Sequence, residues 1–143
     1  MRIIAASIDG PNMKKIKVAA GVIFNSNKQV FLAKRADKAD QGGLWEFPGG
    51  KLEPLETSVE ALTRELDEEL GIEVLNAEPL MQISFDYPTK TVQLDVFTVF
   101  EYQGEPWGRE GQKTAWYELS ELVNLSFPEA NKAILAKLLA KFS

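Results

Sequence analysis

The sequence predicts one α+β domain in which helices pack on a mixed central β-sheet. Short segments rich in β-branched residues alternate with turn clusters, which is typical of strands, and only two segments have the spacing of amphipathic helices. The chain has 143 residues, an ordinary length for one domain. Residues 1–12 are interpreted as an N-terminal extension and 13–143 as the domain. Mixed strands with few helices favour layers in which helices cover the sheet.

The first third of the chain is predicted to form strands. The stretches 15–24 and 29–34 are apolar and rich in β-branched residues, and a polar Asn-Ser-Asn-Lys cluster between them predicts a turn. The polar, glycine-containing stretch 35–43 is expected to be a loop. A short extended piece over 45–50 then ends at Pro-Gly-Gly, which indicates a sharp turn.

A helix is predicted over 57–70. Thr57 and Glu60 have the spacing of a capping box, and Gly71 stands where glycine commonly ends a helix. The predicted buried stripe recurs at helical spacing and consists of Val59, Leu62, Leu66 and Leu70.

The second half of the chain is predicted to return to strands and to finish with a helix. Strands are expected over 79–87, 91–102 and 114–118. The final helix is expected over 129–142, with an apolar inner face made of Ile134, Leu135, Leu138 and Leu139.

Two residue types are missing, and their absence narrows the chemistry. The sequence has no Cys, which excludes disulfides and thiol nucleophiles, and no His, which excludes Ser-His triads and His metal ligands. A net charge of −5 argues against binding to nucleic-acid polymers. No apolar run approaches the roughly 18 residues of a membrane span. The first ten residues are too interrupted for a signal peptide, so a cytoplasmic location away from membranes is expected.

Three carboxylates share one face of the predicted helix over 57–70. Glu65, Glu68 and Glu69 are spaced i, i+3 and i+4, which places them within an arc of about 100°. A solvated acidic face would explain the pattern by itself. In a partly buried cleft, however, the same crowding would require a cation. Oxygen ligands without His or Cys then favour Mg²⁺ or Mn²⁺ over zinc.

A longer pattern encloses this acidic face. Its fixed residues, in order, are Gly50, Glu56, Arg64, Glu65, Leu66, Glu68, Glu69, Gly71 and Ile72. In identity and spacing they match the complete Nudix box, so the chain resembles the Nudix hydrolase family and, over 15–139, its MutT-like pyrophosphohydrolases. Three further segments match the same relatives, namely 44–51, 104–112 and 127–131.

The resemblance implies an α/β/α sandwich with a Mg²⁺-dependent hydrolytic site in which Mn²⁺ can substitute. The implied metal ligands are the Gly49 carbonyl, Glu65, Glu68, Glu69 and Glu110. Either Glu65 or Glu110 would act as general base, and Arg64 would hold Glu65 in place. Structural roles are implied for Gly50, Glu56 and Gly71. From the residues alone, Glu110 could also be an exposed loop acid and Arg64 a purely structural ion-pair partner.

The resemblance also implies a nucleotide substrate. MutT-like enzymes hydrolyse 8-oxo-dGTP, and more slowly dGTP, to the monophosphate and pyrophosphate. By this resemblance Asn131 would read the purine edge and Phe47 would pack beside the base, while Arg35 and Lys51 would contact phosphate or ligand. The alternatives are a helix-start role for Asn131, a core role for Phe47 and solvated cations at the other two positions.

The sequence is compatible with two other functions. The stretch 40–45 resembles relatives that prefer cytidine nucleotides, which keeps a CTP, dCTP or modified-pyrimidine pyrophosphohydrolase in view. The turn over 87–90 departs from the MutT pattern, so base contacts from that turn are not assigned. A noncatalytic nucleotide-binding module is disfavoured because the box carboxylates are all present. The expected partner is a small nucleotide, and the expected state is a monomer.

Overall fold

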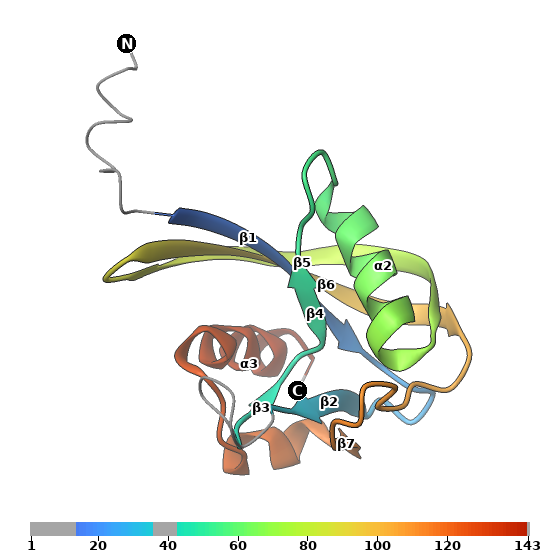
Figure 1. Ribbon diagram of the computed structural model, residues 1–143. Coiled ribbons are helices and arrows are strands. Elements are labelled where there is room, and N and C mark those ends of the chain that lie inside the picture. The colour runs from blue at the N-terminus through green and yellow to red at the C-terminus, as the bar shows by residue number, and fades with distance from the viewer. Residues whose placement is uncertain (1–13, 36–42, 143) are drawn as a thin grey trace.

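The computed structural model describes residues 14–35 and 43–142. The predicted extension 1–12 and most of the predicted loop after Arg35 lie outside these described residues. Within them the chain forms the predicted mixed sheet flanked by helices (Figure 1), which confirms the α+β fold class. None of the helices in the described part of the chain is long and apolar enough to cross a membrane.

The larger sheet has the strand order β4-β1-β6-β5. Its strands are β1 (Lys14–Ile23), β4 (Gly49–Lys51), β5 (Glu73–Tyr87) and β6 (Lys90–Gln103). Strand β1 runs parallel to β6 and antiparallel to β4, which makes the sheet mixed. Strands β5 and β6 form a long antiparallel hairpin.

A second, smaller sheet was not expected from the sequence. Strands β3 (Trp45–Glu46), β2 (Val30–Lys34) and β7 (Thr114–Tyr117) pair in the order β3-β2-β7. Each stretch carries an ordinary strand pattern, so the sequence could not show that they pair apart from the larger sheet. Below this sheet the chain also makes the 3-10 helix η1 (Leu119–Asn124).

Helix α2 (Ser58–Leu70) covers one face of the larger sheet, and α3 (Glu129–Phe142) lies on the other side together with the smaller sheet (Figure 1). The predicted capping box is present, because the Thr57 side chain accepts from the Glu60 N–H and Glu60 accepts from the Thr57 N–H. Gly71 ends the helix in the left-handed conformation, which glycine adopts without strain.

Two buried clusters separate the layers. One packs α2 against β1 and β6 and includes Leu62, Leu66 and Leu70. The other packs α3 against the opposite face and includes Ile134 and Leu138, with Leu135 partly buried. The C-terminal end of α3 is held by Phe142, whose ring contacts Phe24 and Phe100.

Two predictions about local structure were wrong. Val59 is 44% exposed and lies outside the buried stripe of α2, where the small Ala61 is buried instead. Strand β5 begins at Glu73, six residues before the predicted start. Its first part is polar and its pairing with β6 is interrupted by register shifts between Val74 and Met81, so the alternation that marks a strand is broken there.

Candidate active site

Two glycines bring β4 close to its neighbours. A Cβ atom added to Gly49 would overlap the carbonyl oxygen of Ala19 in β1, and one added to Gly50 would overlap the carboxylate of Glu65. The Gly21 N–H donates to the Pro48 carbonyl at 2.8 Å, which fixes the preceding turn against β1. The backbone of the turn therefore lies directly beside the acidic face of α2.

Glu65 and Glu69 form the centre of that acidic face. A hydrogen bond between their carboxyl groups raises the pKa of Glu69 and lowers that of Glu65. Burial, followed by the negative charges of Glu65, Glu110 and Glu46, raises the pKa of Glu69 to about 8. Burial also raises the pKa of Glu65. Burial is the largest cause of both shifts, because it disfavours the charged form of a carboxyl group.

Arg64 holds the edge of the acidic face. Its Nε and Nη2 atoms donate to the two carboxylate oxygens of Glu56 at 2.7 and 3.0 Å, and Nη2 also donates to the Lys51 carbonyl at 3.1 Å. Nη1 lies 3.5 Å from Glu65 and from Glu68. The bidentate pair with Glu56 is the tightest of these contacts, so Arg64 links the loop before α2 to the acidic face.

The pair between Arg64 and Glu56 has a consequence for acid stability. The Arg64 hydrogen bonds, together with the Glu53 N–H, lower the pKa of Glu56 from 4.5 to about 2. A carboxyl with a lowered folded-state pKa stabilises the fold above pH 4.5, and this stabilisation is lost as the pH falls towards 2. We expect Glu56→Gln to lower Tm at pH 7, with the difference from wild type closing between pH 5 and pH 2. A difference that stayed constant over this range would contradict the assignment.

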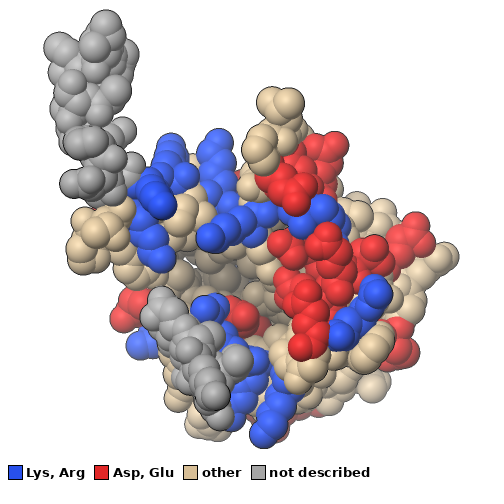
Figure 2. Space-filling view, viewed as in Figure 1, with Lys and Arg blue, Asp and Glu red and all other residues tan. Residues whose placement is uncertain are grey.

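Two more carboxylates approach the pair formed by Glu65 and Glu69. Glu110, on the connection between β6 and β7, and Glu46, on β3, both contribute to the raised pKa of Glu69. Glu68 is exposed and lies beside Arg64. Figure 2 shows acidic side chains gathered over α2 and a hollow beside them, with Lys and Arg side chains across the hollow.

The donor set fits a hard divalent cation. The acidic side chains that meet at this face offer carboxylate oxygens, which Mg²⁺ and similar ions prefer, and a bound cation would stabilise their charged forms against burial and mutual repulsion. Within 14–35 and 43–142, no three carboxylates already converge as a closed cage. A shared ion therefore requires rotation of side chains, which the exposed Glu68 and Glu110 have room to make.

The residues expected to contact the substrate have defined partners or exposure in the structure. The Oδ1 atom of Asn131, in the first turn of α3, accepts from the Phe47 N–H at 3.2 Å. This bond reaches a distant strand end and not the helix that contains Asn131. Arg35 pairs with Glu46 at 2.8 Å, and the Lys51 side chain is exposed.

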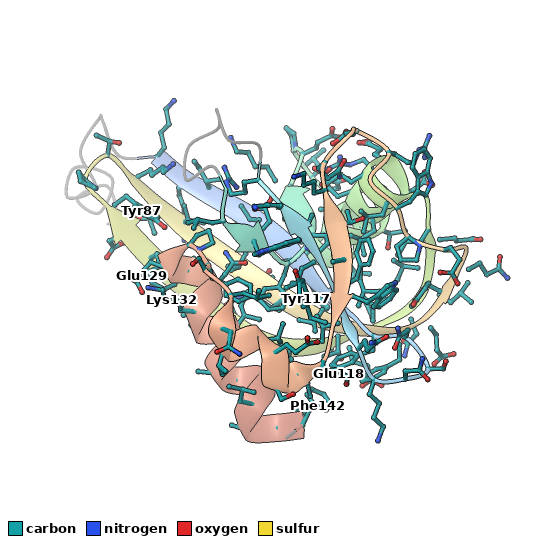
Figure 3. The ribbon with its side chains drawn as sticks, turned by 90° about the horizontal axis from the view of Figure 1, so that it is seen from below. Tyr87, Tyr117, Glu118, Glu129, Lys132 and Phe142 are labelled. Carbon is teal, nitrogen blue, oxygen red and sulfur yellow. The ribbon has the colours of Figure 1, made fainter. Side chains whose placement is uncertain are left out.

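Phe47 lies in the core. Its side chain is only 4% exposed and stacks on Phe127 with 5.5 Å between ring centroids, which agrees with the core role considered for it. The start of α3, with Glu129 and Lys132, lies at the same end of the molecule as Tyr87 near the tip of the β5–β6 hairpin (Figure 3).

Glu46 was not among the site residues predicted from the sequence. It immediately precedes Phe47 and belongs to a two-residue strand, and nothing in that short pattern distinguishes it from an exposed strand acid. A possible ion pair with Arg35 is the feature of the sequence that could have indicated it. Arg35 and Glu46 stand at the two ends of one loop, and the antiparallel pairing of β2 with β3 brings them together.

Comparison with known protein families identifies the family of this chain. The sequence model of the NUDIX domain family matches residues 19–137. This range includes all the carboxylates described above. The chain belongs to the Nudix family. Nudix hydrolases generally require a divalent metal ion, in agreement with the cluster of carboxylates on α2.

The relatives of this Nudix chain are of two kinds. It is 45% identical over 126 residues to an 8-oxo-dGTP diphosphatase from Haemophilus influenzae, covering 88% of this chain and 93% of the relative. It is 35% identical over 128 residues to a CTP pyrophosphohydrolase from Escherichia coli, covering 90% of this chain and 94% of the relative. A structure from a study of MutT from Aliivibrio salmonicida and Vibrio cholerae superimposes with a TM-score of 0.80 at 41% identity, covering 90% of this chain and 100% of that one.

Proposed function

We propose that this Nudix hydrolase converts 8-oxo-dGTP, and more slowly dGTP, to the monophosphate and pyrophosphate with Mg²⁺, for which Mn²⁺ can substitute. The activity would remove an oxidised precursor from the nucleotide pool. The observation that carries the proposal is the hydrogen bond from the Phe47 N–H to the Asn131 side chain, because Phe47 leads directly into the Gly49–Gly50 turn that lies against Glu65. It is supported by the higher identity to the 8-oxo-dGTP diphosphatase than to the CTP pyrophosphohydrolase.

The fixed amide of Asn131 suits an oxidised guanine. Its Oδ1 atom accepts from the Phe47 N–H and keeps a second lone pair, while its amide group can donate. 8-Oxoguanine carries a hydrogen on N7 beside the O6 acceptor, whereas guanine has no hydrogen at N7. An amide held in this orientation can accept from N7–H and donate to O6, so it favours the oxidised base.

The acidic face would perform the hydrolysis. The metal would be held by Glu65, Glu68, Glu69, Glu110 and the Gly49 carbonyl, and would neutralise the phosphate oxygens around the phosphorus that is attacked. Glu65 or Glu110 would remove the proton from the attacking water. Arg64, anchored on Glu56, would keep Glu65 aligned. Lys51 and Arg35 would contact the substrate at the rim of the hollow.

The substrate is tested with steady-state kinetics on 8-oxo-dGTP, dGTP, dCTP and CTP. We expect the highest kcat/KM for 8-oxo-dGTP. A higher value for dCTP or CTP would favour the pyrimidine pyrophosphohydrolase, whose supporting observation is the 35% identical relative. No release of pyrophosphate from any of them would favour a binding module. Light scattering on the same sample tests the proposed monomer.

Asn131→Ala is expected to reduce selectivity more than catalysis. Loss of the amide should lower kcat/KM for 8-oxo-dGTP about 10- to 100-fold, equivalent to one or two lost hydrogen bonds, and should change that for dGTP much less. The measurement is the ratio of the two kcat/KM values in wild type and variant. Asn131→Asp, which keeps the acceptor for the Phe47 N–H but loses the donor, separates base recognition from the backbone bond. Equal losses on both substrates would indicate a structural role.

A further inference from the structure

The connection between β6 and β7 is bound to the C-terminal end of α2. The backbone N–H groups of Trp107 and Arg109 donate to the carbonyls of Leu70 and Glu69 at 3.1 and 3.0 Å. The Arg109 guanidinium also donates, through Nη1, to the Asp67 carbonyl at 2.9 Å. Three carbonyls in the last turn of the acidic helix therefore take donors from one short segment.

The docked segment supplies a positive charge at the C-terminal end of α2. Its last turn contains no basic residue, although a cation is favourable at the negative end of a helix. Arg109 provides that cation from a position about forty residues later in the chain. Gly71 permits the approach, because a Cβ atom there would come within 3.1 Å of the Arg109 Cδ and 3.0 Å of the Trp107 Nε1.

The segment that follows is a closed turn. The Gly111 N–H donates to the Gly108 carbonyl at 2.9 Å, and the Glu110 N–H donates to the Gln112 side chain at 3.0 Å. A Cβ atom on Gly108 would overlap the Gln112 carbonyl. Because the turn is held together internally, fixing Arg109 on α2 also fixes the backbone of its neighbour Glu110.

We propose that Arg109 is a positioning residue that docks the turn carrying Glu110 on the end of α2 and so sets the place of Glu110 beside Glu69. The inference rests on the proposed function, since it gives Arg109 its role through the metal ligand Glu110. In this proposal Arg109 acts on the site only through Glu110. Its backbone and side-chain contacts are both to α2, the helix that carries the other carboxylates.

The test is a double-mutant cycle that combines Arg109→Ala with Glu110→Gln. Two quantities are measured in each protein: the Mn²⁺ concentration for half-maximal turnover, and the increase in Tm that Mn²⁺ produces with a dGTP analogue whose α,β-bridging oxygen is replaced by NH. Arg109→Ala is expected to raise the half-saturating Mn²⁺ concentration about tenfold, as for other residues that orient metal ligands, and to reduce the Tm increase. In the Glu110→Gln background it should change neither quantity further.

Two further variants control for charge and shape. Lys113→Ala removes an exposed cation from the same connection without touching α2, and should leave both quantities unchanged. Arg109→Lys should retain most of the wild-type Mn²⁺ response, because a single guanidinium nitrogen makes the contact with Asp67.

The outcomes separate the inference from the proposed function. If Glu110→Gln leaves the Mn²⁺ response unchanged, the ligand role of Glu110 is wrong, and the proposal for Arg109 is overturned with it. If Glu110→Gln weakens the response but Arg109→Ala does not, the hydrolase assignment stands and the positioning role is overturned. If Arg109→Ala has the same effect in both backgrounds, it acts independently of Glu110, which also overturns the inference.

Discussion

Replacing Glu69 with glutamine should lower turnover of 8-oxo-dGTP at least about 100-fold without lowering Tm. Glu69 is half-buried beside Glu65 and is approached by two further carboxylates. An amide binds a metal ion less strongly than a carboxylate does. Burial and the neighbouring carboxylates disfavour a charge on Glu69, and an uncharged amide avoids that cost, so stability should stay the same or rise. Turnover at saturating Mg²⁺ and Tm without metal are the two measurements.

Asp67→Asn is the matched control for Glu69→Gln. Asp67 is an exposed residue of the same helix, and its contact with Arg109 is made by its backbone carbonyl, so the substitution changes the same charge without changing the acidic face. Turnover should remain close to wild type. If Glu69→Gln retained near wild-type turnover, or if the control lost as much activity, the assignment of Glu69 as a metal ligand would be wrong.

Alanine at Gly49 and alanine at Gly50 should damage the protein in different ways. The new Cβ at position 49 would overlap the backbone of Ala19 in the neighbouring strand, which cannot move without breaking the pairing of β1 and β4. We expect a loss of about 3 kcal/mol or more in the free energy of unfolding, at the upper end for overpacked sites. Chemical denaturation measures this loss.

Gly50→Ala should reduce activity more than stability. Its Cβ would overlap the Glu65 carboxylate, and that side chain can rotate away because it is only half-buried. The expected result is a loss of turnover of at least about tenfold with a smaller loss of unfolding free energy than for Gly49→Ala. The reverse order of stabilities in the two variants would contradict this account of the turn.

The fold and the acidic face could be predicted from sequence because their signals are local. Thr57, Glu60 and Gly71 mark the ends of α2 within a few residues, and the spacing of Glu65 and Glu69 places both on one face of any helix. The glycines of the turn before α2 could be predicted for the same reason, because they belong to the same short pattern.

The rest of the site depends on contacts between distant segments. Glu46 enters through the pairing of β2 with β3, and Arg109 through its contacts with the last turn of α2. Neither pairing leaves a periodic signal in the sequence, because each arises from the packing of whole elements. The exposure of Val59 has a similar cause, since the way α2 packs on the rest of the molecule decides which residues of its first turn are covered, and it covers Ala61 instead.

The parallel pairing of β1 with β6 has a consequence for how the enzyme is made. Lys14 pairs with Lys90, so β1 gains its parallel neighbour only from a strand synthesised much later, and such distant pairings slow folding. Everything that forms the acidic face is encoded between these partners or after them. A ribosome-bound chain therefore lacks the central pairing of its larger sheet until β6 has emerged.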